Sequence, residues 1–228
     1  MKIPEVHDLI KMLLGMQLSI EIFVVTWIVA FSVAVVLTVF RATGYKLARN
    51  LVDAFVEYQL NVPLLVHVFF WYLGIPEILP ESVGNWLNEH DSALWLAAIA
   101  LSLSSAAYIA EDIRSGLQAI PATQHEAARA LGSGYLTTMR RIILPQALRH
   151  AIPALTGRAL LLFKSTSVVM AIGVVELTYQ TREIDNETYN TFAIFLVSTL
   201  LYLAGSFFIM FMGRRVQSYY RLPGGRHG

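Results

Sequence analysis

Ionisable side chains interrupt two apolar stretches of this sequence, and they are candidates for contact with a solute. Arg158 and Lys164 lie in the stretch 153–175, and His67 lies in the stretch 62–79. A charge at the centre of a bilayer costs about 2.5–3.5 kcal/mol on insertion scales, so such groups usually face protein or water and have a role. The candidates for a solute path through these stretches are Lys164, Ser167, Thr166, His67, Arg158 and Pro63.

Lys164 shares one helix face with Thr156 and Ser167, because residues spaced by three and four positions align on a helix. The lysine therefore belongs to a partly polar stripe. It could line a translocation path and meet a carboxylate. The alternative is a buried structural pair with Glu57 or Glu176.

Arg158 and His67 also have two interpretations each, and Pro63 has one. Arg158 could contact an acidic solute, or extend its head to the membrane interface. His67 could line a path, or be a packing histidine with satisfied nitrogens. Pro63 is expected to kink or break its helix, and the backbone groups that it frees could line a cavity.

Signatures of enzymes are absent from the sequence. There is no cysteine, no Gly-x-Ser-x-Gly turn, no His-Glu-x-x-His pair and no Gly-x-x-x-x-Gly-Lys-Ser/Thr loop for ATP. An intramembrane hydrolase would have to use His67 with one of the serines Ser102, Ser104 or Ser105, which helix packing explains equally well. A passive scaffold or channel is a further alternative.

Composition indicates a membrane protein that positions these residues on helices. Hydrophobic residues make up 56% of the 228 residues and charged residues only 14%, against about 25% charged in soluble domains. The net charge of +1 gives no basic field that would attract nucleic acid. Apolar stretches long enough to span a bilayer predict five transmembrane helices in one domain, 1–228: residues 17–40, 62–79, 92–110, 153–175 and 191–213.

The distribution of basic residues predicts the orientation of these spans. Lysine and arginine concentrate after the first span, between the third and fourth, and after the fifth, for example Arg41, Arg140 and Arg214. Cytoplasmic loops carry such an excess. We therefore expect the N-terminus outside and the C-terminus in the cytoplasm.

The loop 111–152 is too long for a simple connection and contains a short predicted helix. Thr123 and Glu126 have the spacing of a capping box at its start. Gly132 and Gly134 could adopt the left-handed conformation that ends it. About eight residues between these signals make a rod roughly 12 Å long. Such a smooth, alanine-rich rod is well shaped to occupy a groove of another protein.

This loop resembles the Glu-Ala-Ala loop in permease subunits of binding-protein-dependent ABC importers. The matching positions begin at Glu126, Ala127 and Ala128, continue with Gly132, and end with Ile142, Leu144 and Pro145. Further similar segments are Ala107–Glu111, Ile113–Gly116, Lys164–Ser167 and Ile172–Thr178. The resemblance implies an all-α membrane protein with the type I importer fold, in the bacterial inner membrane.

The resemblance also implies partners that this chain lacks. A dimer of ATP-binding subunits would bind ATP and Mg²⁺ and contact the matching loop positions, so this chain would need no cofactor and would not be an enzyme. A second permease subunit, identical or homologous, would complete the path. A periplasmic or extracellular solute-binding protein would deliver the solute.

The external region is similar to glutamate/aspartate permeases. The similar segments are Phe70–Tyr72, Pro76–Pro80 and Gly84–Trp86. This resemblance implies import of glutamate or aspartate. Basic or neutral polar amino acids such as arginine, histidine or glutamine are the alternative. Gly157 and Arg158 stand where the family frequently has an Asn-Glu pair, which makes Arg158 a candidate for contact with acidic solutes.

Overall fold

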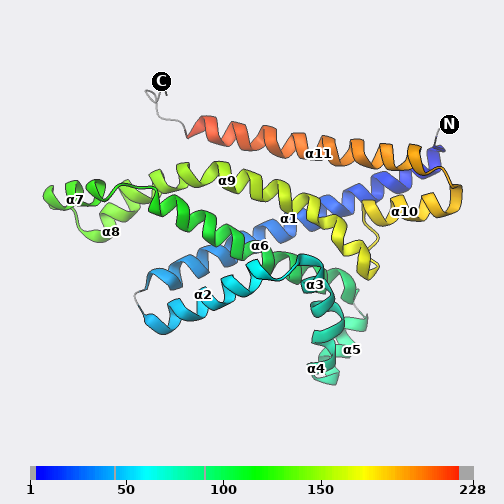
Figure 1. The fold of residues 1–228 in the computed structure, drawn as a ribbon, viewed down its shortest axis with the longest axis horizontal. Coiled ribbons are helices and arrows are strands. Elements are labelled where there is room, and N and C mark those ends of the chain that lie inside the picture. The colour runs from blue at the N-terminus through cyan, green and yellow to red at the C-terminus, as the bar shows by residue number, and fades with distance from the viewer. Residues whose placement is uncertain (1–3, 44, 90, 221–228) are drawn as a thin grey trace.

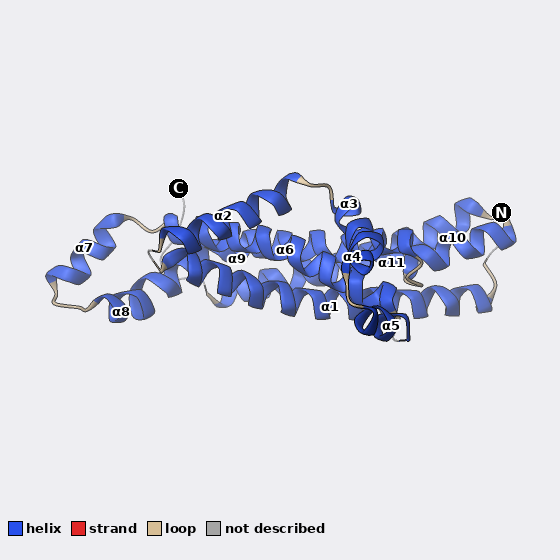
Figure 2. Cartoon of the chain, turned by 90° about the horizontal axis from the view of Figure 1, so that it is seen from below, coloured by secondary structure: helices blue, strands red, loops and turns tan. Residues whose placement is uncertain are grey.

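The computed structural model describes residues 4–43, 45–89 and 91–220, and every regular element within them is a helix (Figure 2). The outermost parts of the predicted domain, residues 1–3 and 221–228, lie outside this description. The helices form an elongated bundle (Figure 1). Helix α7 (Ala122–Ala130) projects from one end of the bundle, and the C-terminal end of α11 (Thr191–Tyr219) points toward that same end.

Four helices in the described part of the chain are long and apolar enough to cross a membrane. They are α1 (Val6–Ala42), α6 (Ser92–Gln118), the continuous helical run Tyr135–Ile172, and α11. A fifth crossing exists if a sharply bent pair of helices counts as one span. The first, third and fifth predicted spans therefore lie within α1, α6 and α11.

The second predicted span, 62–79, is not one straight helix. Helix α2 (Lys46–Asn61) precedes it, and α3 (Leu64–Phe69), the π-helical η1 (Phe70–Gly74) and α4 (Ile75–Ile78) follow at an angle of 108°. The break falls at Val62 and Pro63, as expected for the proline. Proline forces the residue before it into an extended conformation, and Val62 has φ −102° and ψ 130°.

The fourth predicted span, 153–175, begins too late. Helix α9 runs from Leu144 to Ser165 with Pro153 inside it, and the 3₁₀ segment η3 continues from Thr166 to Ile172. Upstream, α6 extends to Gln118. Much of the predicted loop 111–152 is therefore helical continuation of two spans, and α7 with its flanking turns connects them.

One part of the bundle core, between α1, α6 and α9, is rich in alanine. Ala30 and Ala34 of α1, Ala106 and Ala110 of α6, and Ala151 of α9 form one buried cluster. Small residues let helix backbones approach closely where no water drives association. By contrast, α11 buries only Ala193, Ile194 and Ser198 and exposes many large apolar side chains, which suits contact with lipid.

Two further helices complete the bundle. Helix α10 (Leu177–Thr188) packs beside α1 and α11, and α5 (Glu81–Glu89) connects α4 to α6 (Figures 1 and 2). Gly15 of α1 allows the close approach of α10, because a Cβ there would lie 2.9 Å from the Leu177 Cα. The long helices therefore have α7 at one end of the bundle and α10 at the other.

Candidate functional site

Helix α7 begins two residues earlier than the sequence predicts, and the predicted capping box is wrong. Pro121 is the N-cap residue, with φ −59° and ψ 141°, and no side chain caps the helix start. Thr123 is therefore already inside the helix. Proline at this place is already in the conformation that leads into a helix and lacks an N–H that would need a partner. The proline therefore sets the start of α7, and Thr123 and Glu126 do not cap it.

The C-terminal end of α7 confirms the role predicted for Gly132. Gly132 has φ +73°, its N–H donates to the Arg129 carbonyl at 2.9 Å, and the Ser133 N–H donates to the Ala128 carbonyl at 3.0 Å. These two bonds define a Schellman motif. Gly134 differs from the prediction, because its φ of −66° and ψ of 156° are extended and it begins α8 (Tyr135–Thr138).

The surface of α7 is divided between one buried contact and a broad exposed face. Glu126 and Ala127 are exposed, whereas Ala128 is only 2% exposed and packs against its own chain. Next to the exposed face lie three large side chains that sequence reasoning missed: Leu131, Tyr135 and Leu136 are 85%, 73% and 76% exposed. Apolar residues this exposed at a projecting tip are typical of a surface that binds another protein.

The segment after α8 fastens this tip to the bundle. Ile143, in the π-helical η2 (Met139–Ile143), is buried together with Ile120 and Ala147. Its neighbours Ile142 and Pro145 are half-buried, and Leu144 is exposed. The matching positions Ile142, Leu144 and Pro145 thus lie at the root of the projection, away from the exposed face that carries Glu126.

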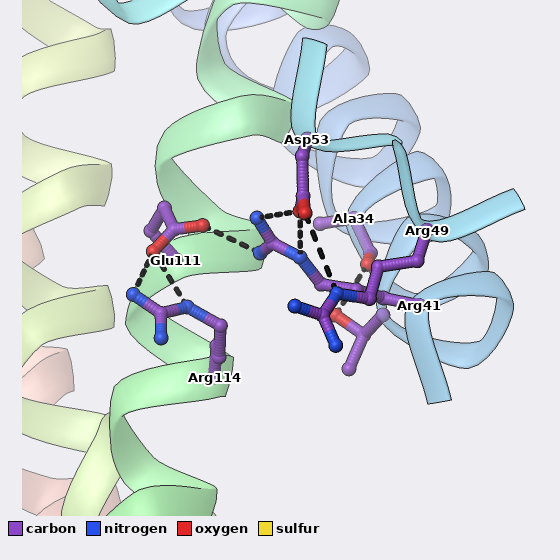
Figure 3. Close-up of polar contacts among 7 residues, drawn as sticks. Ala34, Arg41, Arg49, Asp53, Glu111 and Arg114 are labelled. Carbon is purple, nitrogen blue, oxygen red and sulfur yellow. Dashed lines mark hydrogen bonds and ion pairs between the residues drawn. The ribbon is translucent and has the colours of Figure 1, made fainter. Parts of the chain in front are cut away.

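An ion-pair cluster joins α1, α2 and α6 (Figure 3). Arg41 donates to Asp53 of α2 and to Glu111 of α6, and Arg114 donates from its Nε to Glu111 at 2.8 Å. Arg49 lies 3.7 Å from the second oxygen of Asp53. Arg41 and Glu111 are only about a fifth to a quarter exposed, and their ion pair links α1 directly to α6.

A second ion pair lies deeper, between α6 and α9, beside a cavity. Arg158 donates to the two carboxylate oxygens of Asp112 at 3.0 and 3.3 Å, and its guanidinium lies 4.4 Å from the centre of the Tyr108 ring. Arg158 and Tyr108 also line a cavity of about 230 Å³. The remaining lining combines hydroxyl and apolar groups: Ser104, Ser105, Ser165, Val62, Leu64, Leu161 and Leu162.

Of the predicted path residues, Arg158 alone lines this cavity. Lys164 is exposed on α9 and forms an ion pair with neither Glu57 nor Glu176. Ser167 and Thr166 donate to backbone carbonyls one turn back, at 2.7 and 2.8 Å, and Thr166 is buried.

The two predicted residues of the second span lie on α3. His67 is buried and packs edge-on against Tyr58, with ring centres 5.1 Å apart. Pro63 is exposed and caps the start of α3, where its carbonyl accepts from Val66 and His67. Its neighbours Val62 and Leu64 line the cavity, so the helix break contributes to the cavity wall.

Glu176 forms a buried polar cluster near the start of α10. It is 0% exposed, and it accepts from Ser19 at 3.1 Å, from Tyr202 at 2.9 Å and from the Tyr179 N–H at 2.9 Å. Burial raises the pKa of Glu176, and these hydrogen bonds oppose that shift. The carboxylate fastens α10 to α1 and α11.

Comparison with known proteins identifies the family to which this helical bundle belongs. The model of the family described as "Binding-protein-dependent transport system inner membrane component" matches residues 34–221, and the chain belongs to this family. It is a membrane permease subunit of an amino-acid ABC importer, with the type I importer fold. ATP hydrolysis belongs to a separate subunit, so the chain is not an enzyme, and the hydrolase alternative is wrong.

Individual relatives differ in the solute that their names record. The glutamate/aspartate import permease protein GltJ of Escherichia coli (strain K12) is 32% identical over 94% of this chain and 89% of its own length. The arginine transport system permease protein ArtQ of Bacillus subtilis (strain 168) is 28% identical over 94% of this chain and 93% of its own length. A solved structure of an amino acid ABC transporter with histidines superposes with a TM-score of 0.84 at 24% identity, covering 96% of this chain and 100% of that one, which shows the shared fold.

Proposed function

We propose that this permease imports amino acids with an acidic side chain, glutamate or aspartate. The observation that supports this proposal is Arg158, a cation on the wall of a cavity between α6, α9 and the α2–α3 break. A guanidinium is suited to a carboxylate, because its N–H groups match the two oxygens in a planar fork. The similarity to a glutamate/aspartate permease points to the same solutes.

The test is to purify the chain with its co-purifying subunits and binding protein. ATP hydrolysis is then measured with glutamate, aspartate, glutamine, arginine and histidine in turn. Stimulation by glutamate and aspartate is the expected result. Stimulation by arginine and not by glutamate would contradict the acidic substrate and support the alternative of basic or neutral polar solutes.

We infer that α7 contacts the ATP-binding subunits from the cytoplasm of a bacterial cell, with the N-terminus outside. The exposed face with Glu126 and Ala127, next to Leu131 and Tyr135, supports this contact. The projection lies at the end of the bundle toward which the basic C-terminal end of α11 points. Basic residues favour the cytoplasmic side.

The path itself requires a second permease subunit. The cavity of about 230 Å³ is lined by residues of α6, α9 and the α2–α3 break, too small a set of elements to enclose a path across a membrane. Lys164 is exposed on α9, where a second subunit could enclose it together with the pocket. A two-fold or pseudo-two-fold pair is the simplest closed arrangement.

A further inference from the structure

We propose that Asp112 is a specificity-determining residue of the cavity, which limits Arg158 to binding a single carboxylate of the solute. This inference rests on the proposed function and adds to it a residue that the sequence did not single out. Three observations carry it: the geometry of the ion pair, its burial, and the position of its two members relative to the cavity.

The geometry leaves part of the arginine free. A guanidinium has five N–H donors, arranged along two edges that can each hold a carboxylate. Asp112 occupies the edge formed by Nε and Nη2, at 3.0 and 3.3 Å. The other edge, formed by Nη1 and Nη2, has no hydrogen-bond partner among the described residues.

Because the Arg158–Asp112 pair is partly buried, the aspartate charge strongly affects the electrostatic field at the cavity. The side chains of Arg158 and Asp112 are only 24% and 15% exposed. Charges that are partly removed from water are screened less than surface charges, so the aspartate offsets much of the positive field of the arginine. Breaking such a pair leaves an uncompensated charge.

Only one member of the pair lines the cavity. Arg158 lines it, together with Tyr108 and three serines, and Asp112 is absent from the lining. Asp112 therefore acts from behind the arginine, as a positioning residue. Tyr108 lies against the guanidinium at 4.4 Å from its ring centre and holds its plane.

These features predict how the site discriminates between solutes. With Asp112 in place, Arg158 offers one edge and a reduced positive charge, so the site favours the side-chain carboxylate of glutamate over the amide of glutamine only moderately. Without the aspartate charge, both edges and the full positive charge become available. Selectivity for glutamate over glutamine should then rise.

The experiment measures binding to the complete permease and ATP-binding complex in lipid nanodiscs, without the binding protein. Radiolabelled glutamate and glutamine are titrated, and the ratio of their dissociation constants is the readout. Asp112→Asn and Asp112→Ser should each shift this ratio toward glutamate by about tenfold, the size expected for losing one nearby opposing charge. Asp112→Glu, which keeps the charge, should retain the wild-type ratio.

The matched control is Asp53→Asn, which disturbs the ion pair with Arg41 between α1 and α2, and neither residue of that pair lines the cavity. It should leave the ratio unchanged even if it lowers stability. Two variants at Asp112 are used so that poor assembly of one still leaves a measurement. An unchanged ratio in an assembled Asp112 variant, an equal shift in Asp53→Asn, or no amino-acid binding to the wild-type complex would overturn the proposal.

The same preparation separates this proposal from the proposed function. ATP hydrolysis stimulated by glutamate and the binding protein is measured on the wild type. If stimulation is present and the Asp112 variants keep the wild-type ratio, the function stands and the inference fails. If glutamate and aspartate do not stimulate hydrolysis, the proposed solute itself is wrong.

Discussion

At the scale of single residues, Glu176 shows how a buried carboxylate stabilises this fold. Its three acceptor bonds join α1, α10 and α11, and replacing it by alanine leaves the Ser19 and Tyr202 hydroxyls and the Tyr179 N–H without that partner. Unsatisfied buried donors cost about 1–3 kcal/mol each, although hydroxyls can turn to other acceptors. We expect Glu176→Ala to lower the unfolding free energy by about 3 kcal/mol, measured as a fall in the melting temperature.

Two comparisons make this prediction specific. Glu176→Gln should lose less than Glu176→Ala, because its amide oxygen can accept from Tyr179 and its NH₂ can donate to the Tyr202 or Ser19 oxygen. Glu183→Ala, at an exposed position of the same helix, should leave the melting temperature unchanged. Equal stability of Glu176→Ala and the wild type would show that this cluster has no structural role.

Gly132→Ala tests whether the turn after α7 is needed for coupling to ATP hydrolysis. Gly134→Ala is its control. Alanine at 132 meets no atom within 4 Å but must adopt φ +73°, which costs about 1 kcal/mol. The Schellman turn should then distort, and solute-stimulated ATP hydrolysis should fall severalfold while membrane insertion stays normal. Gly134→Ala has an ordinary φ of −66° and free space, and it should behave as wild type. Equal activity of both variants would contradict a role for this turn.

At the scale of helices, the packing of α6 on α9 depends on Gly116. A Cβ at this position would lie 2.7 Å from the Ala147 carbonyl oxygen and 3.0 Å from the Ala151 Cβ. Gly116→Ala must therefore push the two helices apart close to the base of α7. Overpacking of this kind costs about 1–3 kcal/mol, and we expect a lower melting temperature and weaker coupling.

Gly157→Ala is the matched control for this prediction. Gly157 lies in α9, and a Cβ there meets nothing within 4 Å. The substitution should be neutral or slightly stabilising, because alanine favours helix more than glycine does by up to about 1 kcal/mol. A Gly116→Ala protein as stable and active as Gly157→Ala would show that α6 and α9 have room to adjust.

Much of the helical framework could be predicted from the sequence, because apolar length is a strong signal. The spans within α1, α6 and α11, the break at Pro63 and the end of α7 at Gly132 follow from apolar runs, proline and glycine. The start of α9 could not be predicted. Pro153 is compatible with a helix start and with a helix interior, and the charged residues before it hide the continuation.

The candidate site was predicted only in part, because its partners are distant in the sequence. Arg158 stood out as a charge in an apolar stretch. Its partner Asp112, 46 positions away, follows Glu111 in a segment that reads as the polar end of a span. Pairing across α6 and α9 depends on the relative rotation of the two helices, which one sequence does not reveal. The same reason explains why Lys164 was given two possible partners and contacts neither.

At the scale of the whole molecule, the cavity and the projecting helix α7, to which we assign the two proposed functions, lie at different places along the bundle. The cavity with Arg158 lies between the long helices, and the projection with α7 extends from one end of them (Figure 1). Helices α6 and α9 belong to both, since each contributes to the cavity and continues to the base of α7. A pull on α7 would therefore act on the two helices that hold Arg158 and Asp112.

The most direct test of this account places one cysteine on α7. The sequence contains no cysteine, so Ala127→Cys would be the only thiol of this chain. A photo-cross-linker attached there in the assembled transporter should join the chain to the ATP-binding subunit, and an impermeant thiol reagent added outside intact cells should not label it. Ser82→Cys on α5 should give the opposite results. Labelling of Ala127→Cys from outside, or no cross-link to the ATP-binding subunit, would contradict the account.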